Sequence, residues 1–149
     1  MNTVTSIATA AAVGIILSAS GIGATAFAQE GLRIRIRMGE QMVSARLNGS
    51  AAARDLAAML PVSIRMRDHM RREKTGPIPG PLSERTAGVS TYELGDLGYW
   101  RPGGNFVIFY RHDGLTIPPP GIVLLGKVDA GVAIFDMPGP VDVKVESID

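Results

Sequence analysis

The sequence predicts a mainly β protein, a closed barrel of about eight strands with one short helix after the second strand. Short apolar or alternating runs recur between residues 32 and 146, and Gly- and Pro-rich turns separate them. Only one early segment, 51–60, has its apolar residues at helical spacing. This pattern favours a barrel of short strands over a parallel α/β sheet, whose strands alternate with helices.

Length and composition are those of one globular domain. The chain has 149 residues, of which 46% are hydrophobic and 19% are charged, and this balance is not that of a disordered chain. The formal net charge of +1 gives no reason to expect a nucleic-acid partner. Because the chain has no cysteine, its stability must come from the core rather than from disulfides.

Residues 1–28 differ from the rest. The stretch 7–28 has no charged side chain and ends in Ala26-Phe27-Ala28, the small-x-small pattern of a secretory signal. We therefore expect a signal peptide over 1–28 and a barrel domain over 29–149. The mature protein would be periplasmic or secreted, with no membrane attachment after cleavage. The first six residues lack Lys and Arg, so an uncleaved membrane anchor is the alternative.

The first two strands form a predicted hairpin. Leu32–Met38 alternates strictly, with apolar residues on one face and three arginines on the other. The turn 39–41 then leads into a returning strand over Met42–Leu47. The arginines are either a basic stripe for an acidic surface or a solvated face whose charges a neighbouring strand meets.

A helix and a third strand follow. Ser50 is placed to cap a helix over Ala51–Leu60, which Pro61 ends. Val62–Arg67 alternates again, with Ser63, Arg65 and Arg67 on its polar face. The prolines of 68–90 predict an irregular stretch, in which the basic run 71–74 is a solvated loop.

A central hairpin within Tyr92–Tyr110 organises the remainder. It comprises a strand over 97–100, a turn over 101–105 and an apolar strand over 106–110. After a loop over 111–120, residues 122–128 predict another strand, and 132–135 is apolar but too short to assign. The last strand, 141–146, alternates; if it pairs with the first, Asp142 and Glu146 meet the arginine stripe.

Chemical motifs are sparse. His69 and His112 are isolated from other ligand-type residues, so we expect no metal site. The sequence has no recognisable phosphate loop or nucleophile-base arrangement, and we expect no cofactor.

Three segments, in their order, resemble one known family. Gly95–Trp100, Pro102–Tyr110 and Leu125–Gly131 are similar to segments of the bacterial cyclophilin-like fold proteins, particularly the small single-domain group. The strand pair that precedes residue 48 and the helix and strand of residues 48–67 also match, and the resemblance covers nearly all of 31–146.

The resemblance implies a ligand surface on the barrel. In true cyclophilins, which are prolyl isomerases, an arginine and a glutamine join a proline pocket lined by aromatic residues. By position Arg65 would be the arginine, but the family's His-Arg pair and its Phe-x-x-Gln are absent, and Gln29 and Gln41 lie elsewhere. The predicted ligand-binding residues are Arg65, Tyr99, Trp100, Phe109, Tyr110 and His112.

Two functions remain from these residues, besides a purely structural role. The first is a non-catalytic module that binds a proline-containing peptide or a small apolar ligand. The second is a weak peptidyl-prolyl isomerase that uses Arg65 as its catalytic residue together with the same aromatic surface. We expect the first, because without a glutamine to hold the substrate backbone the prolyl nitrogen would not be fixed near the arginine. We expect a monomer or a weak dimer.

Overall fold

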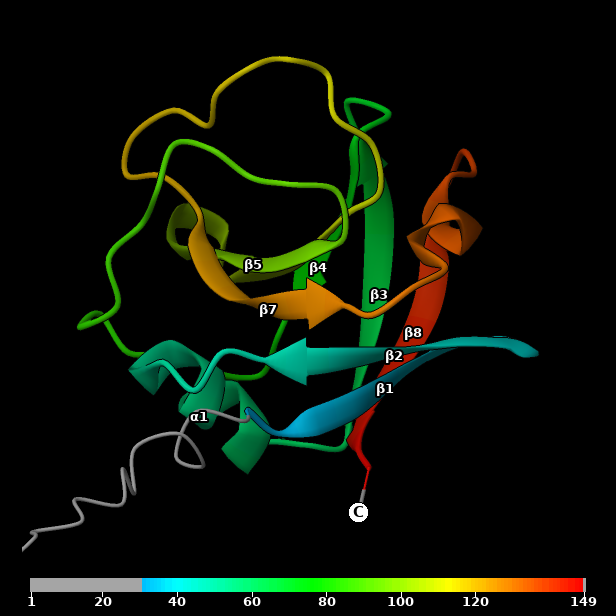
Figure 1. Ribbon diagram of the computed structural model, residues 1–149, viewed down its shortest axis with the longest axis horizontal. Helices are drawn as coiled ribbons and strands as arrows, with labels where there is room; N and C mark the ends of the chain where they lie inside the picture. The colour runs from blue at the N-terminus through cyan, green and yellow to red at the C-terminus, as the bar shows by residue number, and fades with distance from the viewer. Residues whose placement is uncertain (1–30, 149) are drawn as a thin grey trace, which may run out of the picture.

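Eight antiparallel strands close into a barrel in the computed structural model, which describes residues 31–148 (Figure 1). Around the barrel the order is β1-β2-β7-β5-β6-β4-β3-β8. The strands are β1 (Arg33–Met38), β2 (Gln41–Leu47), β3 (Val62–His69), β4 (Glu73–Pro77), β5 (Asp96–Trp100), β6 (Asn105–Phe109), β7 (Val123–Val128) and β8 (Val141–Ser147). The predicted mainly β barrel, with a helix after its second strand, is confirmed. The predicted signal peptide and its cleavage site lie outside the described residues.

The last strand closes the barrel. β8 pairs with β1 on one side, where Ile36 lies opposite Val145, and with β3 on the other. Glu146 lies 3.7 Å from Arg35 and 3.8 Å from Arg37, so part of the predicted arginine stripe meets a neighbouring strand. The other carboxylate considered for that stripe, Asp142, pairs with Arg65 of β3 at 2.7 Å instead.

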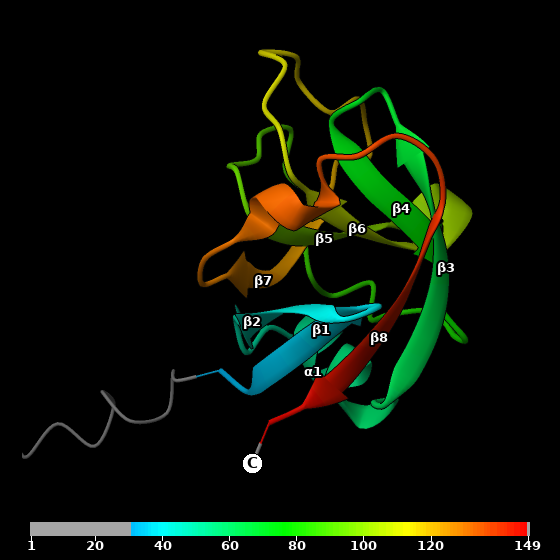
Figure 2. The same cartoon turned by 90° about the vertical axis from the view of Figure 1, so that its right-hand side faces the viewer.

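Short helical segments cover the two ends of the barrel (Figures 1 and 2). At one end lies α1 (Ala51–Ala58), whose first turn is capped because the Ala53 amide donates to the Ser50 hydroxyl at 3.2 Å. Leu56 of α1 is fully buried in the core. The 3₁₀ turn η2 (Val132–Phe135) lies at the other end and buries Phe135. A second 3₁₀ turn, η1 (Arg101–Gly103), joins β5 to β6. Within residues 31–148, no helix has the length and apolar character needed to cross a bilayer.

The stretch predicted to be irregular contains a buried strand. β4 pairs with both β3 and β6, and Arg72, Glu73 and Lys74 are all buried, so the prediction of a solvated basic loop is wrong. These charges are buried because the fold pairs them: Arg72 meets Glu73 at 3.0 Å, and Lys74 meets Asp68 at 2.9 Å. β4 has the sequence Glu-Lys-Thr-Gly-Pro, which gives no apolar alternation from which a strand could be recognised.

Candidate functional site

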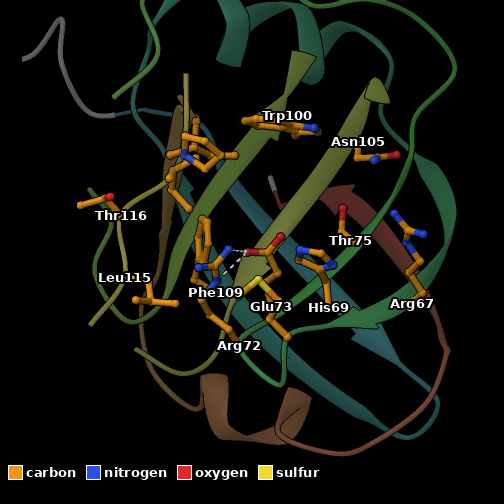
Figure 3. Close-up of a pocket in the computed structure, with 14 residues that line it drawn as sticks. Arg67, His69, Arg72, Glu73, Thr75, Trp100, Asn105, Phe109, Leu115 and Thr116 are labelled. Carbon is orange, nitrogen blue, oxygen red and sulfur yellow. Dashed lines mark hydrogen bonds and ion pairs between the residues drawn. The ribbon is translucent and has the colours of Figure 1, made fainter. Parts of the chain in front are cut away.

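A cavity of about 470 Å³ lies on the outer wall of the barrel, over β3, β4, β6 and the end of β5 (Figure 3). Strand register explains which side chains meet there, because directly opposite residues point to the same face of a sheet. His69 lies opposite Glu73, and Glu73 lies opposite Phe109. Farther along the strands, Arg67 lies opposite Thr75. The outer face of three paired strands therefore supplies one wall of the cavity.

Apolar side chains form the other wall. Phe109, Ile117 and Ile122 belong to a second, smaller apolar cluster outside the barrel, and the half-buried Trp100 packs against it. Gly98 makes room for this cluster, since a Cβ there would come within 2.5 Å of Ile122. The chain can thus lay its 111–122 segment directly on the sheet, and the cavity forms at the edge of that contact.

A network of aromatic and charged groups fixes the 111–122 segment. Tyr92 stacks between Phe109 and His112, with ring centroids 4.0 Å and 4.5 Å away. Its hydroxyl donates to Asp113 at 3.2 Å, and Asp113 also accepts from the Arg72 guanidinium at 3.2 Å. The Leu115 amide donates to Asp113, and this hydrogen bond lowers the pKa of Asp113. Burial raises that pKa, but the net result is a value below the ordinary one.

Glu73 is the buried acid of the cavity. Burial raises the pKa of its carboxyl, and the neighbouring Arg72 offsets this in part. Only one of its two oxygens, Oε2, accepts hydrogen bonds from Arg72. Figure 3 shows the Glu73 carboxyl in the middle of the cavity, between the Arg72 guanidinium and the His69 ring. Its other oxygen remains available to a donor from a ligand.

Three further polar side chains in the cavity wall have no partner within residues 31–148. Thr75 is only 4% exposed, yet its hydroxyl makes no hydrogen bond in that range. The side-chain amide of Asn105 is likewise unbonded, and Arg67 forms no ion pair there. Thr75 is buried, Asn105 is half-buried and Arg67 is exposed, and all three retain hydrogen-bonding capacity that a ligand can use.

The residues predicted from the sequence are divided among several places. Trp100 and Phe109 line the cavity. Tyr99 and Tyr110 are buried in the core inside the barrel. The remaining two lie outside the cavity: His112 is exposed and stacks on Tyr92, whereas Arg65 is held by Asp142 in a shallow groove on another part of the wall.

Sequence reasoning missed most of the polar wall. Arg67 belonged to the predicted outer face of β3 and could have been chosen with Arg65, since residues two positions apart on a strand point to the same face. Glu73 and Thr75 carried no signal, because β4 itself was not recognised. Asn105 was assigned to a turn, and only its place at the start of β6 brings it to the cavity.

A second charged cluster lies inside one end of the barrel, apart from the cavity. Lys74 is 0% exposed, and its ammonium donates to Asp68 at 2.9 Å, to the Gly139 carbonyl at 3.0 Å and to the Met137 carbonyl. The Tyr110 hydroxyl also donates to Asp68. Burial opposes ionisation of Asp68, but the hydrogen bonds from Tyr110 and Lys74, with the nearby cations, hold its pKa below its ordinary value. Every group of this cluster has a partner, so its role is structural.

No group of three or more metal-ligating side chains suited to a metal ion occurs within residues 31–148. The chemistry of the outer cavity is instead that of hydrogen bonding beside an apolar surface. A closed eight-stranded antiparallel barrel, covered by a helix at one end and carrying its cavity on the outer wall, is the architecture of cyclophilin-like proteins.

The comparisons with known proteins agree with this class. Residues 36–146 match the model of the cyclophilin-like family, and the chain belongs to that family. A hypothetical protein from Archaeoglobus fulgidus, known from its solution structure, has a similar fold with a TM-score of 0.60. The two are 19% identical, over 80% of this chain and 97% of that one. Among curated proteins, no sequence matches the chain.

Proposed function

We propose that this protein is an exported, non-catalytic binding module whose outer-wall cavity takes a short extended peptide with an apolar side chain. The observation that carries the proposal is the set of polar side chains with free hydrogen-bonding capacity beside an apolar surface. Arg67 and Asn105 offer donors for a peptide carbonyl, and Glu73 and Thr75 offer acceptors for a peptide N–H. The apolar side chain of the peptide would lie against Phe109 and Ile122.

Peptide backbone suits this wall better than a purely apolar ligand. An apolar molecule would cover Thr75 and Glu73 without replacing the hydrogen bonds that water gives them, and that desolvation costs binding free energy. An amide group carries one donor and one acceptor and satisfies both kinds of group. The cavity volume also falls within the range of small-ligand sites, roughly 300–1,000 Å³.

The fluorescence of Trp100, the only tryptophan, provides the test. We expect saturable changes with blocked tripeptides acetyl-Ala-Xaa-Ala-amide in which Xaa is Leu, Phe or Pro, and weaker changes with Ser. Thr75→Val preserves the shape of the side chain and removes the hydroxyl, and it should weaken binding about fivefold. A wild-type signal that does not saturate with any of these peptides would reject the proposal.

Arg65 and Arg67 form a matched pair of variants. Both are exposed arginines on the outer face of β3, but only Arg67 lines the cavity. We therefore expect Arg67→Ala to weaken peptide binding several-fold and Arg65→Ala to leave it unchanged. Equal effects of the two variants would show that the peptide does not occupy this cavity.

The isomerase alternative is tested with the proline peptide. Catalysis requires a donor held close to the prolyl nitrogen, because amide resonance creates a barrier of roughly 20 kcal/mol. Arg67 is the exposed arginine of the cavity, but none of the described residues that line the cavity is a glutamine that could fix the substrate backbone. We expect isomerisation at the uncatalysed rate. A rate enhancement that Arg67→Ala abolishes would identify an enzyme instead.

A further inference from the structure

The turn between β3 and β4 has an unusual backbone. Met70 and Arg71 have φ values of 55° and 52°, in the left-handed region, and the Arg72 amide donates to the His69 carbonyl at 3.1 Å. Turns whose two central residues both have positive φ favour Asn, Asp and Gly there, because most side chains with a Cβ are strained in that conformation. Within residues 31–148, these two are the only residues other than glycine with positive φ. The sequence therefore keeps two unfavourable residues at one turn.

Contacts inside the protein account for Arg71 but not for Met70. The Arg71 guanidinium pairs with Asp136 at 3.0 Å and with Asp68 at 3.6 Å, and it lies over the Tyr110 ring. The Met70 side chain is 54% exposed and belongs to neither apolar cluster. Met70 therefore has two unfavourable features: a strained left-handed backbone conformation and an apolar side chain exposed to water.

The location of Met70 suggests its role. It lines the outer cavity, and so does Leu115 of the 111–122 segment, which is 56% exposed. These two are the most exposed large apolar side chains of the described residues, and both belong to the same cavity. They come from different walls: Met70 from the β3–β4 turn, and Leu115 from the segment held by Asp113.

From this arrangement we infer that Met70 and Leu115 are specificity-determining residues that contact the ends of long apolar side chains of a bound peptide. The inference rests on the proposed function. A ligand side chain that reaches the rim of the cavity removes both exposed groups from water, whereas a short one reaches neither. Methionine suits this position because its flexible thioether adapts to side chains of different shape. The preferred residue is therefore Leu, Met or Phe rather than Ala.

The test compares two blocked peptides, acetyl-Ala-Phe-Ala-amide and acetyl-Ala-Ala-Ala-amide, through the fluorescence of Trp100. Met70→Asn places a residue that tolerates left-handed φ in the turn and removes the apolar contact. We expect its Tm to rise by about 2–4 °C, because strain is relieved. Its affinity for the Phe peptide should fall about fivefold while its affinity for the Ala peptide does not change.

Two further variants make the result specific. Leu115→Asn should reduce discrimination between the peptides to a similar extent without raising Tm. Met42→Asn is the matched control, since Met42 is 50% exposed on β2 and does not line the cavity. It should leave discrimination unchanged.

The outcomes separate this inference from the proposed function. If the wild-type protein binds neither peptide, the proposed function fails and the inference fails with it. If the wild type prefers the Phe peptide and both Met70→Asn and Leu115→Asn retain that preference, the inference alone is overturned. Loss of preference in these two variants, with wild-type behaviour of Met42→Asn, supports it.

Discussion

The buried lysine inside the barrel gives a stability prediction that follows directly from its contacts. Lys74→Met keeps most of the side-chain volume and removes the ammonium. It takes one hydrogen bond from the Asp68 carboxylate and leaves the carbonyls of Met137 and Gly139 without this donor. The Asp68 side chain, which is 12% exposed, then retains Tyr110 and the more distant Arg71 as its partners among residues 31–148.

The expected cost is about 3 kcal/mol at neutral pH. Removing one partner of a buried ion pair typically costs about 3–5 kcal/mol, and the lower end applies because Asp68 keeps other partners. For a domain of this size, each kcal/mol corresponds to a Tm change of about 4 °C. The melting temperature should therefore fall by about 12 °C.

The cost should also depend on pH. In the wild type the pKa of Asp68 is lowered, so its contribution is present above the unfolded value of about 3.9 and is lost as pH falls through the folded pKa. In Lys74→Met this pKa rises, because a hydrogen bond and a positive charge are gone. The difference in unfolding free energy between the two proteins should shrink as pH falls from the raised pKa of Asp68 in the variant toward its lowered pKa in the wild type.

Urea unfolding of both proteins over a range of pH measures this difference. Lys144→Met is the matched control, since Lys144 is half exposed and lies 3.7 Å from Glu146; it should cost less than about 0.5 kcal/mol. In the double variant Asp68→Asn/Lys74→Met, the total cost should be less than the sum of the two single costs. A cost for Lys74→Met below about 1 kcal/mol, or one equal at neutral and acid pH, would refute the reasoning.

Three other predictions concern closure, titration and export. Removing residues 141–149 should expose the edges of β1 and β3, and aggregation should follow; a monomeric product with unchanged Tm in size-exclusion and melting experiments would contradict this. Because burial raises the pKa of Glu73, the stability of the wild type relative to Glu73→Gln should fall as pH rises from about 4 through the folded pKa; a flat difference in urea unfolding would contradict it. N-terminal sequencing of the exported protein should begin at Gln29, and a sequence beginning at Met1 would reject cleavage.

The alternation of apolar and polar residues predicts most of the barrel strands, because adjacent side chains on a strand face the core and the solvent in turn. β1, β3 and β8 each place apolar side chains on every second position, and their inward residues are buried as the period of two requires. β4 has no such contrast. Glu73 of β4 is paired with the adjacent Arg72, and Arg72 in turn is paired with Asp113, which is 41 residues away in the sequence; no local pattern reveals that pairing.

The site was harder to predict than the fold for a related reason. Tyr99 and Trp100 are neighbours on one strand, so their side chains point to opposite faces of the sheet. Alternation alone does not indicate which of the two faces carries the cavity. Likewise Arg65 and Arg67 share a face, and the choice between them depends on where β4 and the 111–122 segment lie along β3. That placement is set by tertiary register, including the shift between Leu97 and Gly98 in the pairing with β7.

The polar and apolar walls of the cavity come from different parts of the chain. Thr75 and Glu73 come from a strand paired on both sides, so their positions are fixed by the barrel. In the apolar wall, Ile117 and Ile122 come from the 111–122 segment, which depends on Asp113 for its attachment. Arg72 bonds both Glu73 and Asp113, and it thereby ties the strand to the segment. Under the proposed function, changes in the segment would therefore alter which peptide side chain the cavity accepts, while Thr75 and Glu73, which would bind the peptide backbone, stay in place.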